Sequence, residues 1–258
     1  MDLNPIMLKA GAEIMRVYAG DIAVTTKGDA SPVTEADERA ERIILENLKS
    51  LAPDVPVVAE EEAAAGRLPE IGNRFFLVDP LDGTKEFISK NGEFTVNIAL
   101  IEDGIPVYGA VFAPALDRLF WGGGTEAFAA DVHNGEIVNI TAIRVRATPD
   151  AGLSAIGSRS HGGDATQEYL KAFSVAEFVA AGSSLKFCRL AEGAADIYPR
   201  MGRTMEWDTA AGDAILRAAG GRVETLDGQP LLYGKRVQDD APFANPHFVA
   251  FGDPAIRP

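Results

Sequence analysis

The chain has 258 residues, of which 47% are hydrophobic, 8% aromatic and 24% charged, and its formal net charge at pH 7 is −14. This composition is typical of a globular protein with one large domain or two closely packed ones, whose core needs no disulfide or structural metal. The negative charge argues against a nucleic-acid polymer as partner, because phosphate backbones require surfaces rich in Lys and Arg. A small phosphorylated ligand remains compatible, since metal ions can neutralise its charge locally.

Cysteine content and the N-terminal residues bear on the compartment. The single cysteine, Cys188, excludes an intrachain disulfide and a cysteine-rich zinc site, and it suits a reducing cytoplasm. The first residues, MDLNPIMLKAGAEIM, have neither the basic start nor the continuous apolar run of a signal peptide. No stretch approaches the roughly 20 apolar residues of a transmembrane helix. We therefore expect a cytoplasmic protein without a transmembrane segment, either a monomer or a homodimer.

The predicted elements change character along the chain. A first helix is expected with Asn4 as its N-cap and Gly20 at its end, and a second helix is expected to begin near Thr34. Predicted strands follow at residues 55–59, 74–79, 94–101, 105–112 and 118–121. After about Pro149, strands at 153–157, 175–180 and 196–199 alternate with helices at 164–173, 184–193 and 209–219. This change predicts two packed lobes, an N-terminal α+β lobe of residues 1–149 and an α/β lobe of residues 150–258.

The stretch LVDPLDGTKEF, residues 77–87, places Asp79 and Asp82 three positions apart at the end of a predicted buried strand. Two carboxylates a few ångströms apart repel, and burying each of them is costly unless positive charge compensates. An Asp-Gly turn is the simpler alternative. However, a turn does not need a second carboxylate close to the first, where the two charges would repel each other. The pattern therefore favours a cation site.

Three more acidic clusters lie at the ends of predicted elements. Glu60, Glu61 and Glu62 follow the strand VPVVA, Asp37 lies in SPVTEAD, and Asp208 lies in MEWDTAAGD. Taken singly, these clusters could be a solvated acidic run, a capping box and a helix N-cap. Together they indicate a shared site for Mg²⁺, which prefers oxygen ligands. Two such ions about 3.5–4 Å apart can serve an in-line phosphoryl transfer.

These motifs resemble those of the inositol monophosphatase-like superfamily of Mg²⁺-dependent, lithium-sensitive phosphatases. The resemblance extends from residue 31 to residue 212 and rests on SPVTEAD, VVAEEE, LVDPLDGTKEF, NGEFTVNIALI, GSRSH, GSSLKFCRLAEGAADIYPR and WDTAAG. DGTKEF, NGEFTVNIAL and SSLKFC are most similar to the 3'(2'),5'-bisphosphate nucleotidases of bacterial sulfur metabolism. The resemblance implies an αβαβα layered sandwich with the active site between the lobes.

The resemblance also implies roles for individual residues, with two or three Mg²⁺ ions as cofactor. The metal ligands would be Glu61, Asp79, the carbonyl of Leu81, Asp82 and Asp208. Thr84 and Glu61 would position the attacking water, and Asp37 would hold a third ion or orient water. The residues implied in substrate binding are Gly83, Thr84, Lys85, Ser160, His161, Ser183, Lys186, Arg200 and Asp208.

The expected reaction is removal of the 3'-phosphate from adenosine 3',5'-bisphosphate, which gives AMP and phosphate. The same chemistry on an inositol or sugar phosphate is one alternative. A second is a protein that senses the bisphosphate without hydrolysing it. A third is an acidic structural protein whose carboxylates only keep it in solution.

Overall fold

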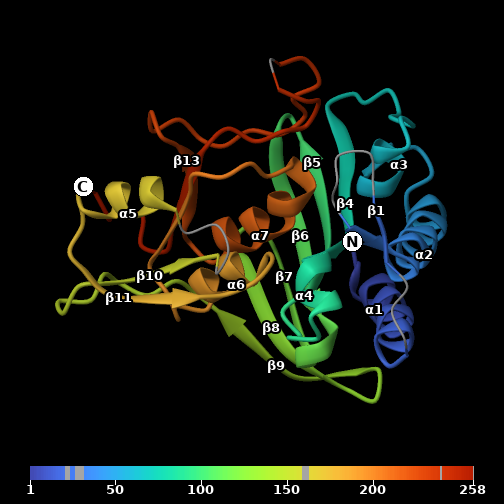
Figure 1. The fold of residues 1–258 in the computed structure, drawn as a ribbon, viewed down its shortest axis with the longest axis horizontal. Helices are drawn as coiled ribbons and strands as arrows, with labels where there is room; N and C mark the ends of the chain where they lie inside the picture. Colours follow the sequence, from blue (N-terminus) through green and yellow to red (C-terminus); the bar gives the residue numbers. More distant parts are fainter. Residues whose placement is uncertain (21–23, 27–31, 159–162, 239, 258) are drawn as a thin grey trace.

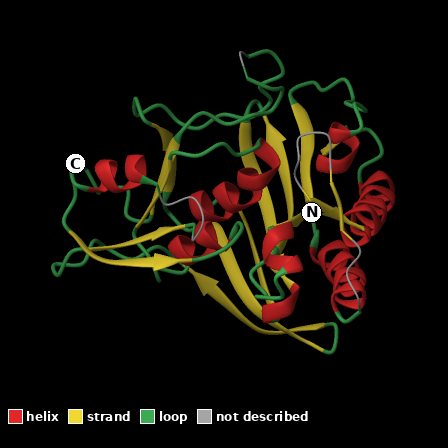
Figure 2. Ribbon diagram, in the orientation of Figure 1, coloured by secondary structure: helices red, strands yellow, loops and turns green. Residues whose placement is uncertain are grey.

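The computed structural model describes residues 1–20, 24–26, 32–158, 163–238 and 240–257, and its elements stack in five layers (Figures 1 and 2). Helices α1 (Asn4–Tyr18) and α2 (Glu35–Leu51) form the first layer and a seven-stranded sheet the second. Helices α6 (Leu185–Ala191) and α7 (Glu206–Ala218) form the third layer. A five-stranded sheet and α5 (Asp164–Leu170) complete the stack. The expected αβαβα sandwich is therefore confirmed.

The larger sheet is built from consecutive strands. Its order is β3-β4-β5-β6-β7-β8-β9, and all neighbours are antiparallel except the parallel pair β3 and β4. The strands are β3 (Val57–Ala59), β4 (Arg74–Asp82), β5 (Thr95–Glu102), β6 (Ile105–Ala113), β7 (Arg118–Gly123), β8 (Glu126–His133) and β9 (Glu136–Ile143).

The smaller sheet has the order β11-β10-β12-β14-β13. Its strands are β10 (Leu153–Gly157), β11 (Val175–Ala180), β12 (Ile197–Arg200), β13 (Arg222–Thr225) and β14 (Phe248–Phe251). The short elements are β1 (Val24–Thr26), β2 (Pro32–Thr34), α3 (Glu60–Ala64), α4 (Thr84–Ile88) and the 3₁₀ turn η1 (Pro114–Leu116).

Strand β4 is covered by helices on both faces of the sheet. Phe76 and Val78 pack into the core shared with α1 and α2, whereas Phe75 and Leu77 pack into the core shared with α6 and α7. A strand buried on both faces reads as a continuous apolar run, which is how the sequence reads before Asp79. On the second face α7 approaches closely, because a Cβ at Gly109 would lie only 2.4 Å from the carbonyl oxygen of Ala211.

Most element boundaries differ by a few residues from the expected ones, and two helix starts change the role of a named residue. Leu3, and not Asn4, is the N-cap residue of α1. Helix α7 begins at Glu206, so Asp208 is the third helical residue and not an N-cap. Strands β1, β2, β8, β9, β13 and β14 and helix α3 were not predicted. No helix within the described ranges is long and apolar enough to cross a membrane.

Candidate active site

A cavity of about 310 Å³ lies where the end of β4 meets the beginnings of α3, α4, α6 and α7. Its lining combines acidic, hydroxyl and basic side chains from both halves of the chain. The lining residues are Glu60, Asp79, Leu81, Asp82, Gly83, Thr84, Lys85, Glu86, Ser158, Ser183, Lys186, Phe187, Tyr198, Arg200, Arg203, Thr204, Asp208 and Thr209. Most of the predicted site residues therefore share one cavity.

Asp79 and Asp208 are the carboxyl groups whose ionisation the site opposes most. Burial raises the pKa of Asp79 well above its usual value, and the charges of Glu60, Asp82 and Asp208 raise it further. Burial, followed by the charges of Asp82 and Glu60, likewise raises the pKa of Asp208. A cluster of oxygen donors that repel one another in this way suits a divalent cation, which would remove the repulsion.

The local backbone at the end of β4 sets the positions of Asp79 and Asp82. The pairing of β4 with β5 shifts register between Asp79 and Asp82, and the Asp79 Oδ1 atom accepts a hydrogen bond of 3.0 Å from the Leu81 N–H. Among the described residues, no group of three or more acidic, histidine or cysteine side chains is already arranged to hold a metal ion.

Glu60, and not Glu61, lies in this cavity. Glu60 lines the cavity and its charge acts on both Asp79 and Asp208, whereas Glu61 lines a separate cavity together with Glu41. Glu60 directly follows β3 and is the first residue of α3, so it lies beside the end of β4. Of the two residues, only Glu60 lies among the other predicted metal ligands, and the predicted Glu61 does not line this cavity. The sequence alone did not distinguish the two, because three consecutive glutamates offer no periodic signal.

Asp37 belongs to the capping box of α2 and also contacts Thr84. Its Oδ2 atom accepts hydrogen bonds from the N–H (2.9 Å) and the hydroxyl (2.7 Å) of Thr34, which caps α2. Its Oδ1 atom accepts a 3.3 Å hydrogen bond from the Thr84 hydroxyl. Gly83, at φ +93°, makes the left-handed turn into α4 that brings Thr84 to this position. Lys85 is exposed and lines the same cavity.

A chain of buried polar contacts, not predicted from the sequence, joins Asp82 to the start of α7. The Ser183 hydroxyl donates to Asp82 Oδ2 (2.7 Å) and lies 2.6 Å from the Thr95 hydroxyl. Thr95 donates to Asn97 Oδ1 (2.9 Å), and Asn97 Nδ2 donates to the Ser184 hydroxyl (3.0 Å). The Ser184 hydroxyl then donates to the carbonyl oxygen of Asp208 (2.6 Å). These contacts connect both halves of the chain directly at the acidic cluster.

Basic side chains line the same cavity as the carboxylates. Lys186 is buried, burial lowers the pKa of its ammonium to about 8, and it donates to the carbonyls of Ala181 (3.3 Å) and Ser183 (2.5 Å). The Arg200 Nη2 atom donates to the carbonyl of Arg203, but its buried Nε atom has no hydrogen-bond partner among the described residues. Arg203 also lines the cavity but was not predicted as a site residue. Ser160 and His161 lie outside the described residues.

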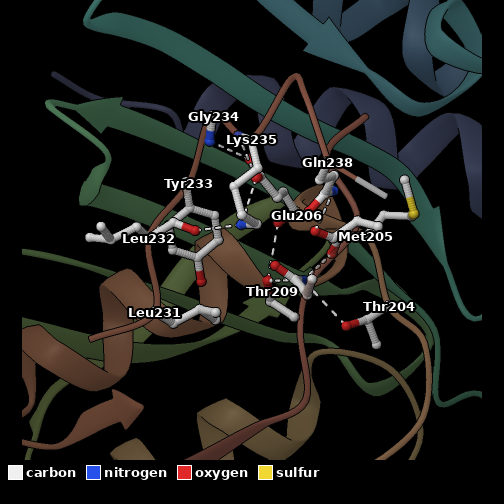
Figure 3. A network of polar contacts seen from close by, with 12 residues as sticks. Thr204, Met205, Glu206, Thr209, Leu231, Leu232, Tyr233, Gly234, Lys235 and Gln238 are labelled. Carbon is white, nitrogen blue, oxygen red and sulfur yellow. Dashed lines mark hydrogen bonds and ion pairs between the residues drawn. The ribbon is translucent and has the colours of Figure 1, made fainter. Parts of the chain in front are cut away.

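Figure 3 shows a polar network that holds the beginning of α7. The buried Glu206 carboxylate accepts hydrogen bonds from the N–H groups of Gly234 (2.6 Å) and Lys235 (2.9 Å), and it forms an ion pair of 2.7 Å with the Lys235 ammonium. Asp208 lies two residues further along the same helix, and its Oδ2 atom accepts the Met205 N–H at 2.8 Å. The network therefore fixes the turn from which Asp208 reaches the cavity.

The sequence matches known proteins over nearly its whole length. Residues 4–244 match the model of the inositol monophosphatase family. The chain is 44% identical over 241 residues to the 3'(2'),5'-bisphosphate nucleotidase CysQ of Salmonella typhimurium (strain LT2), covering 93% of this chain and 94% of the relative. It is 42% identical to the protein of the same name from Escherichia coli (strain K12), with the same coverage.

Solved structures show the same arrangement of the chain. CysQ from Bacteroides thetaiotaomicron, described as a bacterial member of the inositol monophosphatase family, matches with a TM-score of 0.77 and 36% identity, covering 96% of this chain and 94% of that one. The IMPase of Thermotoga maritima matches with a TM-score of 0.74 and 27% identity, covering 96% and 90%. Both sequence and fold therefore agree with the resemblance carried by the motifs.

Proposed function

Because the chain belongs to the inositol monophosphatase family, we propose that it is a Mg²⁺-dependent phosphomonoesterase that removes the 3'-phosphate of adenosine 3',5'-bisphosphate. The products are AMP and inorganic phosphate. The observation that carries this proposal is one cavity whose lining combines the carboxylates of Glu60, Asp79, Asp82 and Asp208 with the basic side chains of Lys186, Arg200 and Arg203. A bisphosphate offers one phosphate to the metal-binding carboxylates and the other to the basic side chains. The names of the curated relatives support the same substrate.

Five groups of this chain are proposed to hold two or three Mg²⁺ ions. They are the carboxylates of Glu60, Asp79, Asp82 and Asp208 and the carbonyl of Leu81. Their all-oxygen donor set fits Mg²⁺, and the raised pKa values of Asp79 and Asp208 mark the positive charge that the cluster needs. When bound, Mg²⁺ polarises phosphoryl oxygens and stabilises the charge that develops in the transition state.

Thr84 and Asp37 are proposed to orient the attacking water. Because the Thr84 hydroxyl donates its proton to Asp37, the lone pairs on Thr84 Oγ1 are directed to accept a hydrogen bond from a water molecule. The backbone N–H groups of Gly83 and Thr84 are proposed to bind the phosphate that is cleaved. In this arrangement the protein forms no covalent bond to the phosphoryl group.

The basic side chains of the cavity are proposed to bind the phosphate that is retained. An ammonium has three N–H donors, and the carbonyls of Ala181 and Ser183 account for two of those of Lys186, so the third can serve a phosphate oxygen. The buried Arg200 Nε atom lacks an acceptor among the described residues, and a phosphate oxygen would supply one. Exposed Lys85 and the pair Ser160 and His161 complete the proposed binding set.

Replacing Arg200 by Met tests whether the basic side chains recognise a second phosphate. We expect kcat/KM for adenosine 3',5'-bisphosphate to fall by roughly 10- to 150-fold, because a charge-assisted hydrogen bond contributes about 1.5–3 kcal/mol. For adenosine 3'-phosphate, which lacks the 5'-phosphate, we expect a change of less than about threefold. Arg200 is preferred to Lys186 for this test because Lys186 also holds the carbonyl of Ser183, whose hydroxyl contacts Asp82. Equal losses on both substrates would argue against this role.

A substrate panel tests the proposed function itself. Phosphate release should be measured with adenosine 3',5'-bisphosphate, AMP, inositol 1-phosphate and fructose 1,6-bisphosphate at saturating Mg²⁺. The proposal predicts the highest kcat/KM for the adenosine bisphosphate. Preference for inositol phosphate or the sugar bisphosphate would favour the same chemistry on another substrate. Tight binding of the adenosine bisphosphate without phosphate release would indicate a sensor.

A further inference from the structure

We propose that Glu41, a buried carboxylate on helix α2, is a positioning residue that fixes the first turn of α3 and thereby directs Glu60 into the acidic cavity. The proposal rests on the metal-binding role proposed for Glu60. Glu41 is only 4% exposed and does not line that cavity. It would therefore act through α3 without touching substrate or metal.

Both oxygens of Glu41 bind the backbone of α3. The Glu61 N–H donates to Glu41 Oε2 at 2.8 Å, and the Glu62 N–H donates to Glu41 Oε1 at 3.0 Å. The N-cap residue of α3, Ala59, provides no side-chain cap of its own. Glu41 therefore supplies from another helix the acceptors that a capping side chain usually provides.

The two hydrogen bonds that Glu41 accepts matter because α3 is short. A helix of five residues has almost no stability of its own, so its orientation depends on contacts with its surroundings. Glu60 lies between buried Ala59, at the end of β3, and the two N–H groups held by Glu41. The backbone on both sides of Glu60 is thus fixed, which limits the directions in which its side chain can point.

Helix α2 carries both Glu41 and Asp37, the residue proposed to orient water together with Thr84. Asp37 and Glu41 are four residues apart and therefore lie on the same face of α2. Asp37 accepts a hydrogen bond from the Thr84 hydroxyl, while Glu41 accepts hydrogen bonds from the backbone of α3. One helix face thus sets the position of Thr84 relative to Glu60, two groups that approach the cavity from different elements.

Calorimetric titration of the metal-free full-length protein with Mg²⁺ tests the proposal. Burial, together with the charges of Glu61 and Glu62, raises the pKa of Glu41 to about 7, so the titration is done at pH 8.5. Glu41→Gln keeps the shape of the side chain but turns one acceptor into a donor that faces an N–H group. We expect its Mg²⁺ dissociation constant to rise by roughly 10- to 100-fold, as for other residues that orient metal ligands.

Glu46→Gln is the matched control, because Glu46 is an exposed residue of the same helix that lines the same second cavity as Glu41. It should bind Mg²⁺ within about twofold of the parent. Unchanged Mg²⁺ affinity in Glu41→Gln, even with a lower melting temperature, would overturn the proposal and leave Glu41 a purely structural role. Parent protein that binds no Mg²⁺ would instead contradict the proposed function. If Glu41→Gln does not fold, Glu41→Asp, whose shorter side chain cannot reach both N–H groups, is read by the same criterion.

Discussion

Asp82→Asn is expected to lose at least about a thousandfold in kcat at saturating Mg²⁺, because bound metal contributes several kcal/mol of transition-state stabilisation. The fold should remain intact, since the Asn side-chain oxygen can still accept the Ser183 hydroxyl. The charge of Asp82 also raises the pKa values of Asp79 and Asp208. Removing that charge relieves repulsion, so the metal-free variant should melt no lower than the metal-free parent.

Two measurements separate this expectation from general damage. Steady-state phosphate release gives kcat over a range of Mg²⁺ concentrations, and a thermal melt in the presence of a chelator gives the stability of the metal-free protein. A large loss of kcat with an unchanged or higher melting temperature would show that the Asp82 charge is needed for metal binding and not for folding. Turnover close to that of the parent would remove Asp82 from the proposed ligand set.

Glu60→Gln and Glu61→Gln are expected to differ strongly, although they change adjacent residues by the same chemistry. Only Glu60 lines the acidic cavity, whereas Glu61 lines the neighbouring one. We expect Glu60→Gln to lower kcat/KM by about 100-fold or more, since it removes an anionic ligand, and Glu61→Gln to change it by less than about threefold. The Glu61 N–H that binds Glu41 is kept in both variants.

The pair provides its own control, because both variants lose one negative charge from α3. Kinetics at several Mg²⁺ concentrations should show a higher Mg²⁺ requirement for Glu60→Gln alone. The reverse order of effects would restore the assignment of Glu61 made from the sequence motif. Equal and large effects would mean that the orientation of α3 as a whole, and not one carboxylate, determines activity.

The sequence predicted the parts of the site where local pattern decides the structure. The apolar run before Asp79 is continuous because β4 is covered on both faces, so the end of that strand could be located. In contrast, β9 is an edge strand whose residues are mostly exposed, so its apolar residues do not mark a buried face as those of β4 do. Asp208 was misplaced at a helix boundary because the polar network around Glu206 lets α7 begin earlier than its apolar pattern.

Contacts between distant segments could not be predicted in the same way. Asn97 and Ser184 are 87 positions apart and meet only because the two sheets pack around α6 and α7. The choice between Glu60 and Glu61 also depended on such packing, since a run of three glutamates offers no periodic signal. The side of α3 that faces the cavity is set by its contact with α2.

Phosphorus NMR of the reaction with adenosine 3',5'-bisphosphate tests the central claim most directly, because it reports which phosphate leaves. With Mg²⁺ present, we predict that the 3'-phosphate resonance disappears while inorganic phosphate and 5'-AMP accumulate in equal amounts. The reaction should stop when Mg²⁺ is chelated and resume when it is restored. Loss of the 5'-phosphate, or hydrolysis that continues at the same rate in the chelator, would contradict a metal-dependent 3'-nucleotidase.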